Sequence, residues 1–439
     1  MSKCENEKMN TLRASAQKML EENILSFWME RMRDPEGGFY GRIDGQNILH
    51  PEAERGAVLN ARLLWAFSAA YRVLRKPEYL DAANHAKDYI EAHFFDREQG
   101  GVFWSLYADG SPCDTKKQTY ALGFMMYAFS EYARATGDEQ AKQTAIALFH
   151  DIEKHAFCEP YDKAGRMNGY IEALTRDWKP IADMRLSDKD ENAVFTMNTH
   201  LHILEPYTNL YRIWPDERLR RSLVTLITIF TERLYNPETG HVDCFFDEHW
   251  IGKKDIASYG HDIEAAWLLN EAFTVLIPQE LKIQSYETRI THNIAVASLE
   301  GLQPDGSMIH ERKYNGVPSV NQRSVCDGES VAQHGALYKR EARSRASVVA
   351  SERQWWVECE AVVGFIDQWQ ITGEEVWFER AEAVWHYIES HLLDREHGEW
   401  YWAVLPDGSP DTDHDKAGFW KCPYHNSRMC LELIERLNS

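Results

Sequence analysis

Two histidines stand out because each begins an apolar stretch beside other polar groups. His261 lies in Ser-Tyr-Gly-His-Asp-Ile-Glu-Ala-Ala-Trp, residues 258–267, and His425 lies in Phe-Trp-Lys-Cys-Pro-Tyr-His-Asn-Ser-Arg-Met-Cys, residues 419–430. An imidazole has an ordinary pKa of about 6.5, so it can accept or donate a proton near neutral pH. If the fold brings both rings to one cavity, they form an acid/base pair.

Each histidine has neighbours that could support it. Glu264 follows His261 by three residues, so the two share a helix face and the carboxylate is expected to fix the imidazole tautomer. The alternative is a buried histidine with an exposed glutamate at an ordinary helix start. Trp420 precedes His425 and could form a stacking wall, and Asn426 after it is a plausible N-cap.

A third polar cluster, Asn-Thr-His-Leu-His at 198–202, also begins an apolar stretch. His200 and His202 could be read as metal ligands together with His261 and Glu264. However, two histidines one residue apart face apart on a helix, and the zinc spacing His-Glu-x-x-His is absent. We therefore predict no metal, with one of the two histidines binding substrate and the other packing.

Arg55 stands just before another apolar stretch, in Ala-Glu-Arg-Gly-Ala at 53–57. A guanidinium there could hold negative charge developing on an oxygen. The alternative is a surface ion pair with Glu52 or Glu54.

Composition narrows the class of protein. The 439 residues carry a net charge of −21, which disfavours nucleic acid and acidic lipid surfaces as partners. The 8 cysteines form no Cys-x-x-Cys pair, the N-terminus lacks an apolar signal segment, and no apolar run of about 18 residues occurs. We expect a cytoplasmic protein, monomeric or homodimeric, that does not enter a membrane. The 12% aromatic content suits helix packing, and also a site where sugar faces stack on rings.

A turn followed by aromatic residues recurs along the chain. Its copies begin near residues 34, 96, 161, 236, 303 and 394, mostly about 60–75 residues apart. The second and last copies align closely, with Asp96, Trp104 and Lys117 matching Asp394, Trp402 and Lys416. Self-similarity at this period indicates a repeated architecture with room for two helices per unit.

Apolar residues between the turns recur at helical spacing. The pattern predicts helices at 12–32, 57–74, 78–93, 120–136, 138–155, 199–214, 216–235, 261–276, 281–299, 355–372, 375–393 and 425–437. One helix of each pair is more apolar, as an inner ring requires. We predict an all-α fold, an (α/α)6 barrel of six hairpins with short β hairpins on one face, forming a single domain over 1–439. Residues 316–353 are expected to be an inserted polar loop.

The three clusters together resemble the N-acylglucosamine 2-epimerase superfamily, and within it the cellobiose 2-epimerases. The resemblance covers about 12–437, and the Lys-Cys-Pro-Tyr-His-Asn run at 421–426 is its most specific part. It implies an (α/α)6 barrel with His261 and His425 as acid/base residues and Glu264 orienting His261. It places Arg55, His202, Asn198 and Tyr120 around the reacting sugar, with Trp420 and one or both of Trp355 and Trp356 as stacking platforms. The chain departs from the family at 316–353, where family members have a much shorter connection, and at Glu358, where the family has Gln.

The implied activity is reversible C2 epimerisation of the reducing-end glucose of β-1,4-linked disaccharides, without metal or nicotinamide. The substrate would be a small sugar such as cellobiose or lactose, and the intermediate a cis-enediolate. Alternatives are an aldose–ketose isomerase or epimerase acting on a monosaccharide such as mannose or N-acylglucosamine, and a non-catalytic sugar-binding protein. A glycoside hydrolase on the same fold would need two carboxylates about 5–9.5 Å apart, and no such pair stands out.

Overall fold

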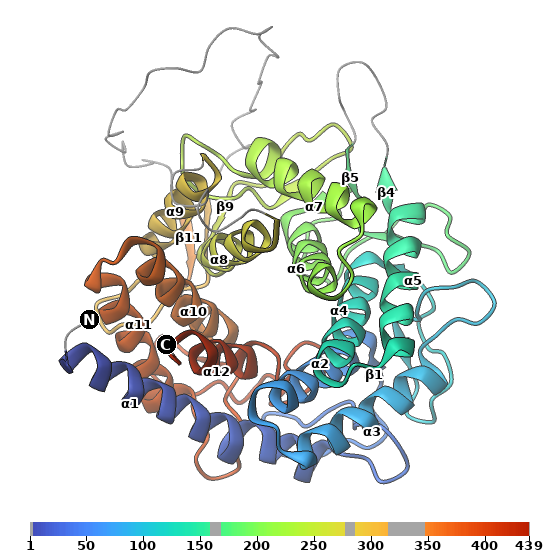
Figure 1. Cartoon of the computed structure of the whole chain (residues 1–439), viewed down its shortest axis with the longest axis horizontal. Coiled ribbons are helices and arrows are strands. Elements are labelled where there is room, and N and C mark those ends of the chain that lie inside the picture. The colour runs from blue at the N-terminus through green and yellow to red at the C-terminus, as the bar shows by residue number, and fades with distance from the viewer. Residues whose placement is uncertain (1–2, 159–167, 277–285, 315–346, 439) are drawn as a thin grey trace, which may run out of the picture.

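The computed structural model describes residues 3–158, 168–276, 286–314 and 347–438. Within these ranges the chain forms two concentric rings of helices (Figure 1). The inner ring contains α2 (Ala57–Leu74), α4 (Thr119–Thr136), α6 (Met197–Ile213), α8 (Tyr259–Leu276), α10 (Trp355–Thr372) and α12 (His425–Arg436). The outer ring contains α1 (Lys3–Met19), α3 (Pro77–His93), α5 (Glu139–His155), α7 (Glu217–Ile229), α9 (Tyr286–Ser298) and α11 (Glu375–Tyr387).

The inner ring closes on itself. Each inner helix contacts the next, and α12 contacts α2 to complete the circle. Each inner helix also packs against one outer helix, with α12 paired to α1 from the opposite end of the chain (Figure 1). The (α/α)6 barrel predicted from the helical period is confirmed.

The two rings differ in how they are buried, as the sequence pattern predicted. In α2, every residue from Ala57 to Ala70 is buried, whereas α3 buries only one face, including Tyr79, Ala82 and Ala86. An inner helix touches neighbours on all sides, so it has no polar face to show to solvent. None of the described helices is long and apolar enough to span a membrane.

Short antiparallel strands directly precede five of the described inner helices, α2, α4, α6, α8 and α10. The pairs are β1 (Arg55–Gly56) with β2 (Ser105–Leu106), β3 (Lys117–Gln118) with β6 (Ala173–Leu174), β4 (Phe157–Cys158) with β5 (Gly169–Tyr170), β7 (Phe195–Thr196) with β8 (Phe245–Phe246), and β12 (Arg353–Gln354) with β13 (Ala403–Val404). A three-stranded sheet joins β9 (Ile256–Ser258), β10 (Glu311–Tyr314) and β11 (Ser347–Ala350). Most of these pairs join the strand just before an inner helix to a strand that follows the next outer helix along the chain. Successive repeats are therefore linked at one end of the barrel.

Several boundaries differ from the prediction. The first helix begins at Lys3 rather than residue 12, and wider π-helical turns at Leu20–Leu25 and Trp28–Met32 continue it. The polar segment 316–353 is not a loop throughout, because Ser347–Ala350 pairs with β10 in the register Glu311↔Ala350; its part at 316–346 lies outside the described residues. Asn426 is not an N-cap: α12 begins at His425, and the buried Asn426 amide donates to Glu399 at 2.8 Å.

A buried ion pair recurs at the repeated turns. Asp96 accepts from Lys117 at 3.0 Å, and the matching residues Asp394 and Lys416 form the same pair. Asp34 and Arg55 form a third pair with the same separation along the chain. In each case the carboxylate lies in the turn after an outer helix, and the cation lies before the start of the next inner helix.

Candidate active site

A cavity of about 370 Å³ lies at the end of the barrel where several inner helices begin. Nine of the ten predicted site residues line it: Tyr120, Asn198, His202, His261, Glu264, Trp355, Trp356, Trp420 and His425. Sequence reasoning missed Arg62, His310 and Trp402, which also line it. Residues far apart along the chain therefore meet in one chamber because the ring closes.

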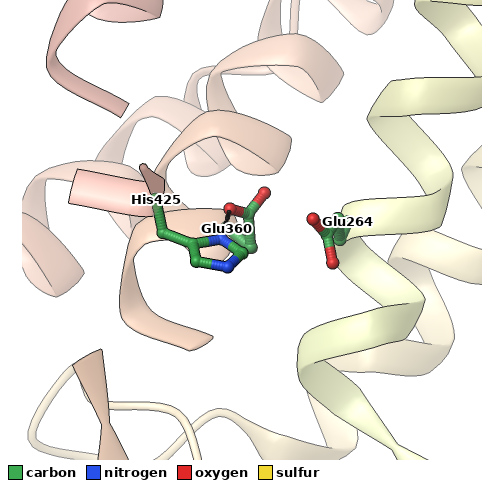
Figure 2. A group of neighbouring side chains, drawn as sticks. All are labelled: Glu264, Glu360 and His425. Atoms are coloured by element: carbon green, nitrogen blue, oxygen red, sulfur yellow. Dashed lines mark hydrogen bonds and ion pairs between the residues drawn. The ribbon is translucent and has the colours of Figure 1, made fainter. Parts of the chain in front are cut away.

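His425 is the first residue of α12 and is almost completely buried. Its Nδ1 lies 2.7 Å from Oε1 of Glu360 (Figure 2), a residue of α10 that the sequence did not single out. Burial raises the pKa of Glu360, and the charge of Arg428 opposes this rise. When Glu360 is ionised it can only accept hydrogen bonds, so Nδ1 then carries the proton and Nε2 is the basic nitrogen. Burial, with the positive charges of Arg62 and Arg428, lowers the pKa of His425 well below its ordinary value, so the ring is neutral at pH 7.

His261 is held differently from the prediction. Its Nδ1 lies 2.8 Å from the hydroxyl of Ser258, at the end of β9, and Glu264 does not contact it. A serine hydroxyl can either donate or accept, so it tolerates both tautomers of His261. Burial, with the neighbouring imidazoles of His310, His202 and His425, lowers the pKa of His261 well below its ordinary value.

Trp356 links the two histidines. Its ring centroid lies 4.8 Å from that of His261 and 5.8 Å from that of His425. The two imidazoles thus lie beside one aromatic platform that is itself half-buried. Trp355 is buried and packs on Trp402 with ring centroids 4.5 Å apart, so Trp356 is the more accessible of the two adjacent tryptophans.

Glu264 pairs with Arg428 rather than with His261. Arg428 Nη2 lies 2.7 Å from Oε1 of Glu264 and 2.6 Å from Oε1 of Glu360. Burial, reinforced by the charge of Glu360, raises the pKa of Glu264 to about 8, so at pH 7 this group holds a proton. Its second oxygen, Oε2, has no hydrogen-bond partner among the described residues.

The same residues bear on the metal question. Glu264, Glu360 and His425 offer three ligand atoms within 4.8 Å of one another (Figure 2). The guanidinium of Arg428 already contacts both carboxylates and supplies the positive charge that a cation would bring. His200 is tied to the backbone, with Nδ1 2.7 Å from the Thr196 oxygen and Nε2 3.1 Å from the Tyr170 nitrogen. The absence of a metal stays a prediction.

Arg55 does not reach the cavity. Its guanidinium is buried against Asp34 and donates to the Gly37 carbonyl at 2.9 Å, so its charge is neutralised within the scaffold. The surface pair with Glu52 or Glu54 is equally absent from its contacts. Arg62, in the second turn of α2, occupies the expected place and donates to the Tyr120 hydroxyl at 2.9 Å.

Arg62 keeps its charge available. It is fully buried, and its hydrogen bonds within the described part of the chain go to the neutral groups of Tyr120 and Cys422. Its guanidinium carbon lies 4.2 Å from the ring centroid of Phe124 and 4.6 Å from that of Tyr424. No carboxylate shares these contacts, so the guanidinium is suited to hold a negatively charged oxygen.

His202 and Asn198 complete the polar wall. His202 Nδ1 lies 3.3 Å from Glu205, and its ring centroid lies 5.0 Å from that of Tyr120. Burial lowers the pKa of His202 despite this carboxylate. The side-chain oxygen of Asn198 is buried, with no partner in the described ranges, and is free to accept from a bound hydroxyl.

A helical barrel whose cavity combines neutral imidazoles, an unpaired guanidinium and tryptophans defines a class of sugar-converting isomerases and epimerases. Residues 38–285 and 318–427 match the family model described as N-acylglucosamine 2-epimerase. Cellobiose 2-epimerase of Bacteroides fragilis is 49% identical, over 96% of this chain and 98% of that protein. Cellobiose 2-epimerase of Ruminococcus albus is 38% identical, over 95% and 97% respectively. The chain belongs to the N-acylglucosamine 2-epimerase family, among its cellobiose 2-epimerase relatives.

A solved structure agrees. Cellobiose 2-epimerase from Bacillus thermoamylovorans superposes with a TM-score of 0.84 at 37% identity, over 97% of this chain and all of that one. The resemblance identified from the three motifs is therefore confirmed at the level of family and fold.

Proposed function

We propose that this protein catalyses reversible C2 epimerisation of the reducing-end glucose of β-1,4-linked disaccharides, converting cellobiose to glucosyl-mannose and lactose to epilactose. The similarity to cellobiose 2-epimerases supports the substrate class. The pair of imidazoles beside Trp356 supports the chemistry. A cavity of about 370 Å³ is large enough for a ligand of this kind.

The single observation that carries the proposal is that both histidines have Nδ1 engaged. Glu360 holds Nδ1 of His425, and Ser258 holds Nδ1 of His261. Nε2 is then the nitrogen of each ring that remains for a molecule in the cavity. Two bases presented to one ligand can act on opposite faces of one carbon.

The reaction begins with opening of the sugar ring, which exposes the C1 aldehyde. Nε2 of one histidine takes the C2 proton, the C–H electron pair forms the C1–C2 double bond, and negative charge moves to O1. The negative charge on O1 favours protonation of the other histidine, which takes a proton from water, delivers it to the opposite face of C2 and becomes neutral again, while the first histidine releases its proton to water. The charge of the histidine pair is the same before and after, and the two exchange roles in the reverse direction.

Arg62 takes the role that the sequence assigned to Arg55, because its unpaired guanidinium can stabilise the charge on O1. One preorganised donor of this kind is typically worth about 10²–10³-fold in rate. Each positioned acid/base group contributes about 10²–10⁴-fold. Only a proton moves, so the redox states balance without nicotinamide, and we propose that neither metal nor cofactor takes part.

The test is incubation of the purified protein with cellobiose in D2O, followed by proton NMR. We expect glucosyl-mannose with deuterium at C2. His425→Ala should abolish turnover while the melting temperature stays close to that of the unchanged protein, and His386→Ala, at an exposed position of α11, should keep full activity. Retained epimerisation in His425→Ala contradicts the assignment.

One alternative shares the cavity. An aldose–ketose isomerase uses the same enediolate but returns the proton to C1 rather than C2. Conversion of mannose to fructose, with cellobiose left unchanged, is the result that favours it.

We also propose a cytoplasmic location. Six cysteines are free thiols, namely Cys113, Cys158, Cys244, Cys359, Cys422 and Cys430, as a reducing compartment allows.

A further inference from the structure

One arginine behind the cavity contacts three carboxylates at once. Arg428 lies in the first turn of α12 with its side chain 1% exposed. It donates to Glu264 at 2.7 Å and Glu360 at 2.6 Å, and it also pairs with Glu205. The motif at 419–430 contains this residue, but the proposed mechanism gives it no role.

Each of the three carboxylates leads to a group in the cavity. Glu360 holds Nδ1 of His425 at 2.7 Å, and Glu205 holds Nδ1 of His202 at 3.3 Å. Glu264 lines the cavity itself. Arg428 does not line the cavity, so its influence on a ligand passes through these three partners.

The same helix offers a close structural duplicate. Arg436, eight residues later on α12, contacts Glu271 at 2.9 Å and Asp367 at 3.0 Å. These acids follow Glu264 and Glu360 by seven residues on α8 and α10. Both arginines lie over Trp267, at 4.8 Å and 5.9 Å from its ring centroid. Arg436 therefore neutralises buried acids between the same three helices, but away from the cavity.

We propose that Arg428 is a positioning residue that keeps Glu360 and Glu205 ionised as acceptors, and so fixes Nδ1 of His425 and of His202 as donors. This inference rests on the proposed function, since the tautomer of His425 matters only if Nε2 receives a proton from the sugar.

The physical reason is the cost of buried charge. Burial alone favours the protonated form of a carboxyl, and a nearby cation opposes this. With Arg428 in contact, the pKa of Glu205 is held at about 2 although burial would raise it. The pKa of Glu360 is raised by burial, and the charge of Arg428 opposes this rise. A protonated Glu360 would lose an acceptor site for Nδ1, and His425 could then turn or change tautomer. The basic nitrogen would no longer face the C2 proton.

The experiment compares Arg428→Lys with Arg436→Lys. Lysine keeps the charge but lacks the planar fork, so it cannot bridge carboxylates in the same way. We expect both variants to fold with similar losses in melting temperature. Arg428→Lys should lower kcat on cellobiose by about 10–100-fold, the range seen when groups that orient a ligating or reacting histidine are changed, with KM within about twofold. Its acid limb of kcat against pH should move to higher pH, because Glu360 becomes easier to protonate.

A second measurement does not depend on a variant of Arg428. Nitrogen NMR of the histidine rings in the unchanged protein should show His425 protonated at Nδ1 and free at Nε2 from pH 6 to 8, with the signal assigned by its loss in His425→Gln. The opposite tautomer overturns the inference. So do equal kcat values in the two lysine variants, which would make Arg428 purely structural. Failure of the unchanged protein to convert cellobiose would instead refute the proposed function, while the tautomer measurement still decides the role of Arg428.

Discussion

At the residue scale, what distinguishes the cavity from the rest of the core is which buried charges are left without a counter-ion. Arg55 forms an ion pair with Asp34, whereas Arg62 contacts neutral hydroxyl, thiol and ring groups. Glu264 shares one arginine with two other carboxylates, so a negative charge on it would be only partly offset, and its pKa is raised to about 8. Burying a partly compensated charge costs stability, and a binding site is where such a cost serves a purpose.

The raised pKa of Glu264 has a consequence for stability that can be measured. Its pKa is about 8 in the folded protein, against an ordinary value of about 4.3 when the chain is unfolded. Its contribution to folding is fully present below the unfolded pKa and is lost as pH rises towards 8. Glu264→Gln cannot ionise and escapes this loss. We therefore expect the melting temperature of Glu264→Gln, relative to that of the unchanged protein, to rise steadily from pH 5 to pH 8.

Thermal unfolding at half-unit pH intervals checks this. Glu172 is also buried with a pKa raised to about 8 by burial, but it is present in both proteins and cancels in the difference. A difference in melting temperature that is flat between pH 5 and 8 would show that Glu264 is already ionised at neutral pH.

At the scale of single elements, the turns explain why one site residue was misassigned. The sequence aligned the turn at Asp96 with that at Asp394, and the structure shows that each aspartate holds a buried lysine 21 or 22 residues later. Asp34 stands at the same separation from Arg55. Had the spacing been applied to the first repeat, it would have marked Arg55 as part of the scaffold and left Arg62 as the candidate arginine.

Arg55→Met should therefore damage the fold and spare the chemistry. Removing one partner of a buried pair leaves the other uncompensated and typically costs about 3–5 kcal/mol in the free energy of unfolding. The double variant Asp34→Asn with Arg55→Met removes the orphaned charge and should recover part of that loss, which urea unfolding measures. In both variants kcat per folded molecule should stay within about twofold of the unchanged value, whereas a loss of 10²-fold would return Arg55 to the catalytic group.

At the scale of the whole molecule, the sequence predicts the barrel well and the contacts across it poorly. Twelve helices follow from apolar spacing, because an inner helix is buried on every side and an outer helix on one. The partners of the histidines do not follow from spacing, since Glu360 reaches His425 from 65 residues away and Arg428 reaches Glu264 from 164 residues away. Such pairs form only when the ring of helices closes, so the local spacing of residues in the sequence does not predict them. Glu264 was assigned to His261 for that reason, because the two lie three residues apart on one helix face.

Closure of the ring also predicts which backbone amides a bound sugar will protect from hydrogen exchange. The first amides of a helix have no acceptor within that helix and exchange readily unless another group covers them. The cavity is lined at Tyr120, Asn198, His261, Trp356 and His425, each within the first turn of an inner helix. In hydrogen–deuterium exchange followed by mass spectrometry, cellobiose at equilibrium should slow exchange in peptides spanning the starts of α4, α6, α8, α10 and α12 together.

The opposite ends of the same helices, near residues 136, 213, 276, 372 and 436, serve as internal controls and should not change. Protection confined to one repeat, or appearing at those far ends, would mean that the ligand binds somewhere other than the chamber formed by closure of the ring.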